Sequence, residues 1–191
     1  MRLSRPSVPS AKFLRDPVTR RYLGIAGAAC MVDLLTKEVA VRVLGDHGVV
    51  SLTERLSLTL VWNTGAAGGV SMGPYTWLIN VVVTVLALGL VLSVVRQMAA
   101  VDPRATMALG LVSGGAVGNL LSIMAGPFGV ADFIGIRLTA DTTMVANVAD
   151  FFLWAGSLML APVGAKLVRL ARAERAQRMA PRAMPVDIEL A

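Results

Sequence analysis

Four apolar segments long enough to cross a lipid bilayer dominate this sequence of 191 residues. They cover residues 22–44, 75–95, 106–124 and 145–163. An α-helix rises about 1.5 Å per residue, so roughly 20 residues cross the hydrocarbon core. Because backbone polar groups in lipid are satisfied only within helices or closed barrels, these segments predict a membrane all-α four-helix bundle.

The composition agrees with a multi-pass membrane protein. Hydrophobic residues make up 55% of the chain and charged residues 16%, whereas soluble domains carry about 25% charged residues. The net charge is +6, but the basic residues gather in the tails rather than among aromatic residues, which argues against a nucleic-acid partner. The single cysteine, Cys30, lies in an apolar segment, so we expect a small core residue there and no disulfide within the chain.

The distribution of basic residues predicts the orientation. Fourteen of the 18 Lys and Arg residues fall in residues 1–21, in the turn at 96–104 and in residues 166–191. In a four-span arrangement these three segments share one side, and the positive-inside rule makes that side cytoplasmic. We therefore expect both termini in the cytoplasm, and residues 45–74 and 125–144 on the outer side.

The outer segments predict a small extracytoplasmic β-rich element. Residues 49–52 and 56–62 are typical of strands, the second with partial alternation of apolar and polar residues. Residues 133–138 are a further candidate strand. We expect this sheet to rest on the membrane surface, with Trp62 and Trp77 at the depth of the interface.

Three regions follow along the chain. Residues 1–21 form a basic N-terminal tail without the apolar core of a signal peptide, and residues 22–165 form the four-span domain. Residues 166–191 form a basic C-terminal tail, in which 166–178 are typical of a helix at the anionic inner leaflet.

Several polar residues interrupt or flank the apolar segments. Asp33 and Lys37 are four residues apart on one helix face, which favours either an ion pair that makes both charges tolerable in lipid or a polar support for a site. Asn63 opens a turn of small residues that is either merely flexible or offers hydrogen bonds to an extended peptide. Asn119 follows the glycine run 114–118, which is typical of close helix packing, and is either a link between helices or part of a site.

Asp132 and Asp150 each lie at the edge of an apolar segment. Taken singly, Asp132 is a loop carboxylate and Asp150 a first-turn residue beside the N-cap candidate Asn147. A carboxylate near lipid is costly, however, and a pair of aspartates sharing one proton can activate water against a peptide bond. His47 is the only histidine and Ser122 lacks an evident base, so a Ser-His site or a histidine-rich metal site is not expected.

Five motifs occur in this order along the chain: Asp33-Leu34-Leu35-Thr36-Lys37, Asn63-Thr64-Gly65-Ala66-Ala67, Gly114-Gly115-Ala116-Val117-Gly118-Asn119, Val130-Ala131-Asp132-Phe133 and Asn147-Val148-Ala149-Asp150. Together they resemble the motifs of the lipoprotein signal peptidase (signal peptidase II) family, over about residues 22–165.

The resemblance implies an aspartyl endopeptidase of the bacterial inner (cytoplasmic) membrane, with its active site near the outer face. It would remove signal peptides from diacylglyceryl-modified prolipoproteins, cutting before the lipidated cysteine. By motif match Asp132 and Asp150 would be catalytic. The supporting and substrate-binding residues would be Asp33, Lys37, Asn63, Gly65, Asn119 and Asn147. No metal or other cofactor is implied, and the partners would be the prolipoprotein and membrane lipids, with the chain a monomer.

Two departures from the family pattern qualify the resemblance. Ser122-Ile123 stands where the family has Asp-Arg, and Gly68 stands where it usually has phenylalanine. The family's arginine helps to position lipid-modified substrate, and isoleucine cannot replace its charge-assisted hydrogen bonds. Arg137 is a candidate substitute. These changes leave open a divergent paralogue that binds lipoprotein precursors or confers resistance to a signal peptidase II inhibitor; a small transporter is disfavoured, since no continuous polar path is evident.

Overall fold

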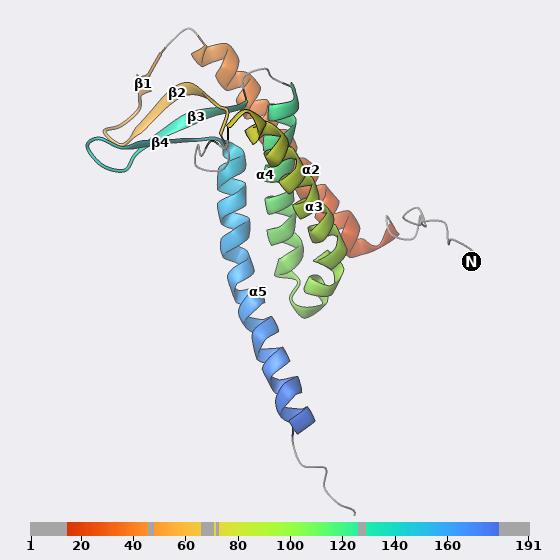
Figure 1. Cartoon of the computed structure of the whole chain (residues 1–191). Helices are drawn as coiled ribbons and strands as arrows, with labels where there is room; N and C mark the ends of the chain where they lie inside the picture. Colours follow the sequence, from red (N-terminus) through yellow and green to blue (C-terminus); the bar gives the residue numbers. More distant parts are fainter. Residues whose placement is uncertain (1–14, 46–47, 66–70, 72, 126–128, 180–191) are drawn as a thin grey trace, which may run out of the picture.

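The structure is a computed structural model that describes residues 15–45, 48–65, 71, 73–125 and 129–179. In these residues four long helices lie side by side, and a four-stranded sheet covers one end of them (Figure 1). The helices are α2 (Pro17–Leu44), α3 (Thr76–Val101), α4 (Arg104–Ala125) and α5 (Val148–Met179). The strands are β1 (Val50–Ser51), β2 (Leu56–Asn63), β3 (Val130–Arg137) and β4 (Thr143–Ala146), and the 3-10 turn η2 (Gly73–Tyr75) precedes α3.

Three helical segments among the described residues are long and apolar enough to cross a membrane: Gly73–Val101, Arg104–Ala125 and Val148–Met179. The mostly helical, multi-pass architecture predicted from the sequence is therefore confirmed. Helix α2 has the length of a span, but Asp33, Lys37 and Glu38 lie within its apolar stretch. Its role as a fourth span, and the orientation of the termini, stay predictions.

The helices begin and end where local chemistry stops them. Helix α2 begins five residues before its predicted start, because the Asp16 carboxylate accepts a hydrogen bond of 2.9 Å from the Thr19 amide and Pro17 occupies the first turn. Such an N-cap satisfies a backbone donor that has no partner within the helix. Between α3 and α4 the chain turns at Asp102 and Pro103, as the polar turn in the sequence predicts.

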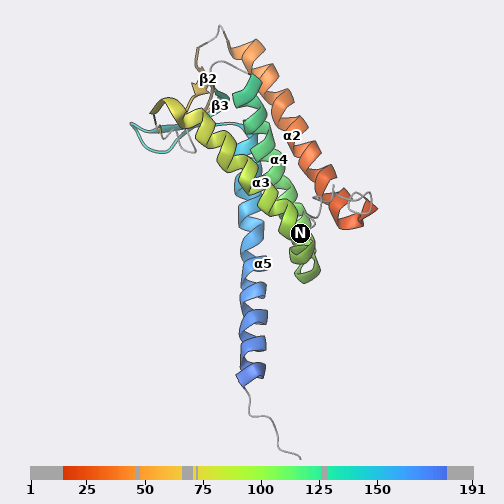
Figure 2. The ribbon, with the colours of Figure 1, turned by 45° about the vertical axis from the view of Figure 1, so that its right-hand side comes forward.

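Helix α4 lies at the centre of the bundle and packs on α2, α3 and α5 (Figure 2). Its glycines permit this approach, because a Cβ on Gly114 would lie 2.5 Å from the Ala26 carbonyl oxygen of α2, and one on Gly115 would lie 2.6 Å from the Ala149 carbonyl oxygen of α5. Gly156 of α5 makes the reciprocal approach to α4. Gly114 and Gly115 thus allow α4 to pack closely against α2 and α5, as small residues do between helices in lipid.

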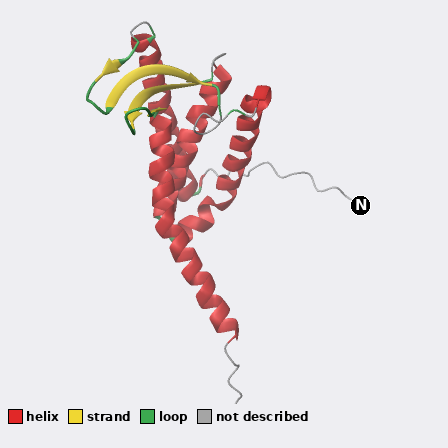
Figure 3. Cartoon of the chain, turned by 60° about the vertical axis from the view of Figure 1, so that its left-hand side comes forward, coloured by secondary structure: helices red, strands yellow, loops and turns green. Residues whose placement is uncertain are grey.

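The sheet is antiparallel throughout, in the order β1-β2-β3-β4 (Figure 3). Phe133 of β3 packs with Ala40 and Leu44 of α2, which fixes the sheet to the end of the bundle. Strands β1 and β2 confirm the predicted outer strands, and β3 begins three residues before its predicted start.

The predicted start of the last helix, at residue 145, is wrong. Residues 143–146 form β4, paired with β3 from Ile134 to Arg137, and α5 begins at Val148. Thr143 and Val145 are β-branched and favour a strand, and Asn147 then caps the helix. At its other end α5 continues to Met179, well beyond the bundle (Figure 1), so the predicted helix over 166–178 is confirmed.

Candidate active site

The motif residues of the sequence gather at the sheet end of the bundle. Seven polar residues form one connected hydrogen-bond network: Asp33, Lys37, Asn63, Asn119, Asp132, Asn147 and Asp150. They come from helices α2, α4 and α5, from strands β2 and β3, and from the junction between β4 and α5. Segments more than 100 residues apart in the chain therefore meet in one place.

The N-terminus of α5 places Asp150 and Asn147 against each other. The Asn147 side-chain oxygen accepts a hydrogen bond of 3.2 Å from the Asp150 amide, and the Asp150 carboxylate accepts one of 2.9 Å from the Asn147 amide. This reciprocal cap, with an acidic residue three positions after the N-cap, satisfies two free amides and puts negative charge at the positive end of the helix dipole. The predicted cap is confirmed, and it fixes the Asp150 carboxylate.

Asp132 lies on β3 and is held by amide side chains on both of its oxygens. Asn147 Nδ2 donates to Oδ1 at 2.6 Å, and Asn63 Nδ2 donates to Oδ2 at 3.0 Å. Asn63 reaches it because Val61 pairs directly with Asp132, and side chains two residues apart share a face of β2. Asp132 is 4% exposed, and this burial raises the pKa of its carboxyl above the ordinary value. The negative charge of Asp150 acts in the same direction, and the two amide hydrogen bonds and the charge of Lys37 oppose it.

A buried ion pair supports Asp150 from the other side. Lys37 Nζ lies 2.6 Å from the Asp33 carboxylate and donates a second hydrogen bond of 2.6 Å to the Asn119 side-chain oxygen. Asn119 Nδ2 in turn donates to Asp150 at 3.3 Å. The free oxygen of Asp33 accepts a hydrogen bond of 2.9 Å from the Ala149 amide at the start of α5. The predicted ion pair is therefore formed, and it belongs to the same hydrogen-bond network as Asp150. Its role as a support of an active site stays a prediction.

Two glycines allow the backbone to approach these side chains. A Cβ on Gly118 of α4 would collide with the Asp33 carboxylate. Gly129 has a φ of +92°, in the left-handed region, and its Cα faces the backbone carbonyl of Asn63 so closely that no side chain fits. Glycine is therefore required at both positions for the network to close.

A pocket of about 400 Å³ opens beside Asn63, between the end of β2 and the first turns of α3. The described residues that line it include Asn63, Thr76, Trp77, Asn80 and Ile123. Asn80 was missed by the sequence reasoning, although an amide in the otherwise apolar segment 75–95 is a signal that could have found it. Its Nδ2 donates to the Gly65 carbonyl oxygen at 3.2 Å.

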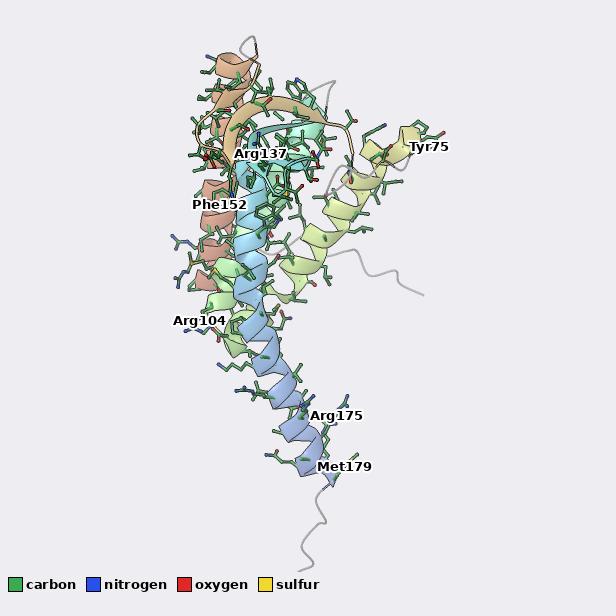
Figure 4. The ribbon with its side chains drawn as sticks, turned by 90° about the vertical axis from the view of Figure 1, so that its left-hand side faces the viewer. Tyr75, Arg104, Arg137, Phe152, Arg175 and Met179 are labelled. Carbon is green, nitrogen blue, oxygen red and sulfur yellow. The ribbon has the colours of Figure 1, made fainter. Side chains whose placement is uncertain are left out.

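The remaining residues singled out in the sequence differ in where they lie. The Gly65 amide donates to Asn63 Oδ1 at 2.9 Å, which fixes the turn after β2. Ile123 lines the pocket. Arg137, labelled in Figure 4, is exposed at the end of β3. It lies five residues from Asp132, an odd spacing that puts the two side chains on opposite faces of the strand. Arg137 does not line the pocket in place of the missing arginine. Gly68 and His47 lie outside the described residues.

Comparison with known proteins identifies the family. The sequence profile described as signal peptidase (SPase) II matches residues 25–163. The lipoprotein signal peptidase of Rhodococcus jostii (strain RHA1) is 37% identical over 165 residues, covering 80% of this chain and 78% of the relative. The chain belongs to the signal peptidase II family.

The chain is also similar to another curated relative and to two solved structures. The lipoprotein signal peptidase of Mycolicibacterium smegmatis is 34% identical over 147 residues, and the match spans 74% of this chain but only 59% of that relative. A solved structure titled a bacterial membrane enzyme, determined in meso at 2.3 Å, superposes with a TM-score of 0.61 at 20% identity, covering 85% of this chain and 93% of that one. A second with the same kind of title, at 1.9 Å, gives 0.63 at 23% identity, over 73% and 88%.

These structural likenesses show that the chain shares the fold of those two membrane enzymes. They agree with a multi-pass membrane protein built from the apolar helices described above. Within the described residues, no group of three or more His, Cys, Asp or Glu side chains is placed to hold a metal ion. The hydrogen-bond network presents two carboxylates, Asp132 and Asp150, that both accept hydrogen bonds from Asn147.

Proposed function

We propose that this chain is a membrane aspartyl endopeptidase that removes signal peptides from diacylglyceryl-modified prolipoproteins, cutting before the lipidated cysteine. The observation that carries the proposal is that Asp132 and Asp150 both bond to one residue, Asn147. Two carboxylates tied to a common support are suited to sharing one proton. Membership of the signal peptidase II family supplies the substrate class.

The proposed mechanism uses the two carboxyl groups in opposite protonation states. The ionised one takes a proton from water while the water oxygen attacks the scissile carbonyl carbon, and the protonated one donates a hydrogen bond to the carbonyl oxygen. When the tetrahedral intermediate collapses, the C–N bond breaks and the departing amine takes a proton from the pair. The apparent pKa values belong to the pair, so neither role is assigned to one residue alone.

The other motif residues hold this pair and the substrate. Asn147 and Asn119 orient the carboxylates, and the Asp33–Lys37 pair orients Asn119. Asn63 and the backbone of the turn at Gly65 offer hydrogen bonds to an extended peptide. In this proposal α2 is the fourth span, both termini are cytoplasmic, and the monomer works in the bacterial inner membrane with the sheet at its outer face.

The experiment is cleavage of a diacylglyceryl-modified prolipoprotein by the purified protein in proteoliposomes, followed by mass spectrometry. We expect loss of the signal peptide at the bond before the lipidated cysteine, and no cleavage of the same precursor without the lipid. Cleavage at another bond, or no cleavage beside an active reference enzyme, would contradict the proposal.

Ile123 favours one second candidate, a divergent paralogue that binds lipoprotein precursors or confers inhibitor resistance without normal turnover. Its side chain lines the pocket where the family pattern has a charged donor. In that case the wild type binds the precursor without cutting it, and Ser122→Asp with Ile123→Arg creates or sharply raises cleavage. An unchanged rate and affinity in the double variant would count against this candidate.

A further inference from the structure

The pocket beside Asn63 is lined, among the described residues, only by uncharged side chains and backbone. None of the described residues that line it is charged; they are amides, hydroxyls, glycines and the apolar side chains of Trp77, Pro74 and Ile123. It nonetheless adjoins the Asp132 carboxylate, because Asn63 lines the pocket and donates directly to Asp132. The pocket thus has one acidic neighbour and no cation in its described wall.

Neither of two cationic side chains, Lys37 and Arg137, lines the pocket. Lys37, the basic member of the network, is bonded to Asp33 and Asn119 and does not line the pocket. Arg137 lies at the far end of β3, and its position five residues from Asp132 puts it on the other face of the strand. An anion entering the pocket would therefore lose its hydration without gaining a charged partner.

The same anion would also be repelled. In the proposed mechanism the pair that includes Asp132 shares one proton and carries one negative charge, and like charges interact strongly across a partly dehydrated site. An uncharged amide or hydroxyl, in contrast, can exchange hydrogen bonds with the amide and hydroxyl side chains of this wall. The side chain of Asn80, one of these residues, is oriented by its hydrogen bond to the Gly65 carbonyl oxygen.

We propose that this pocket is a subsite for an uncharged, hydrogen-bonding segment of the substrate. This inference rests on the proposed peptidase function. Ile123 is the specificity-determining residue of the subsite. It occupies the wall with an apolar side chain, so the pocket discriminates against substrates that place a carboxylate there.

The test uses pairs of diacylglyceryl prolipoproteins that differ only by Asn or Asp at one position, taken in turn at the residues around the scissile bond other than the lipidated cysteine. With the wild type in proteoliposomes, we expect kcat/KM for the Asp substrate to be lower by about tenfold or more at the position facing the pocket. Ile123→Arg is expected to bring that ratio close to one, whereas the matched control Ile123→Leu keeps it.

Equal cleavage of Asn and Asp substrates at every position would overturn the subsite proposal while leaving the peptidase function intact. So would a folded Ile123→Arg variant with the wild-type ratio. If no substrate is cleaved, the peptidase function fails, and affinities for the same pairs in nanodiscs decide the subsite: a preference for Asn that Ile123→Arg removes supports it, and equal affinity or no binding overturns it.

Discussion

Asn147 serves two elements of the structure at once. Its side-chain oxygen caps α5 and its side-chain nitrogen donates to Asp132, while its backbone amide donates to Asp150. Asparagine offers an acceptor oxygen for the cap and a separate NH2 donor for a carboxylate, whereas a hydroxyl would have to use one oxygen atom for both. A single residue at the start of α5 therefore links the two catalytic candidates.

The ion pair of α2 offers a measurable test of its structural role. Lys37→Met leaves the fully buried Asp33 carboxylate without its cation, and removing one partner of a buried pair costs about 3–5 kcal/mol. Arg42→Met is a matched control, since Arg42 and Glu38 form an exposed pair on the same helix with the same spacing and a 2.6 Å contact. Such exposed pairs contribute about 0.3–0.5 kcal/mol. Equal losses in the free energy of unfolding in detergent would contradict this account.

The pH dependence of cleavage follows from the raised pKa of Asp132. A pair that must share one proton loses activity as pH rises through its higher apparent pKa, and also as pH falls far enough to protonate both groups, which gives a bell-shaped profile. The Asn63 hydrogen bond lowers the pKa of Asp132, so Asn63→Ala is expected to move the alkaline limb of kcat/KM to higher pH. A limb that stays in place or moves to lower pH would contradict the assignment.

The sequence indicated most members of the hydrogen-bond network but not their contacts. Asp132, Asp150, Asn119 and the Asp33–Lys37 pair all lie in the motifs that carry the family resemblance, and such motifs are short stretches of chain. Asn80 escaped, since its contact with Gly65 depends on how α3 meets the end of β2. Which side chains meet across elements is a tertiary property that spacing alone does not contain.

At the scale of elements, close helix contact is tested by adding one methyl group. Gly115→Ala would place a Cβ 2.6 Å from the Ala149 carbonyl oxygen, so we expect the variant to lose about 1–3 kcal/mol of stability through overpacking. Gly89→Ala on α3 is the control, because a Cβ there meets nothing within 4 Å. Unfolding titrations in the same detergent should separate the two; similar stabilities would show that α4 and α5 are less tightly packed than described.

The elements also show where sequence reasoning failed. The apolar segment 145–163 was predicted to be one helix. In the structure Val145 belongs to β4, and α5 begins at Val148, after Asn147. A short apolar stretch suits a strand as well as a buried helix, and here the pairing with β3 decides. Helix α2 began earlier than predicted, at Pro17, because the Asp16 cap is a polar signal outside the apolar segment.

For the whole molecule, the account predicts that the sheet and the free end of α5 lie on opposite sides of the membrane. Arg137 on the sheet and Arg175 near the end of α5 are both exposed and far apart along the molecule (Figure 4). In a Cys30→Ser background, Arg137→Cys should react with a membrane-impermeant maleimide added outside intact cells. Arg175→Cys should react only after permeabilisation. Equal labelling of both positions in intact cells would contradict the orientation.

The central claim is that Asp132 and Asp150 act together on the scissile bond. The most direct measurement is the rate at which Asp132→Asn and Asp150→Asn variants cleave a diacylglyceryl prolipoprotein in proteoliposomes, with their unfolding compared with the wild type. We predict that each variant stays folded and loses about 10³-fold or more of the wild-type rate, since neither amide can carry the shared proton. A folded variant of either kind with near wild-type turnover would contradict it.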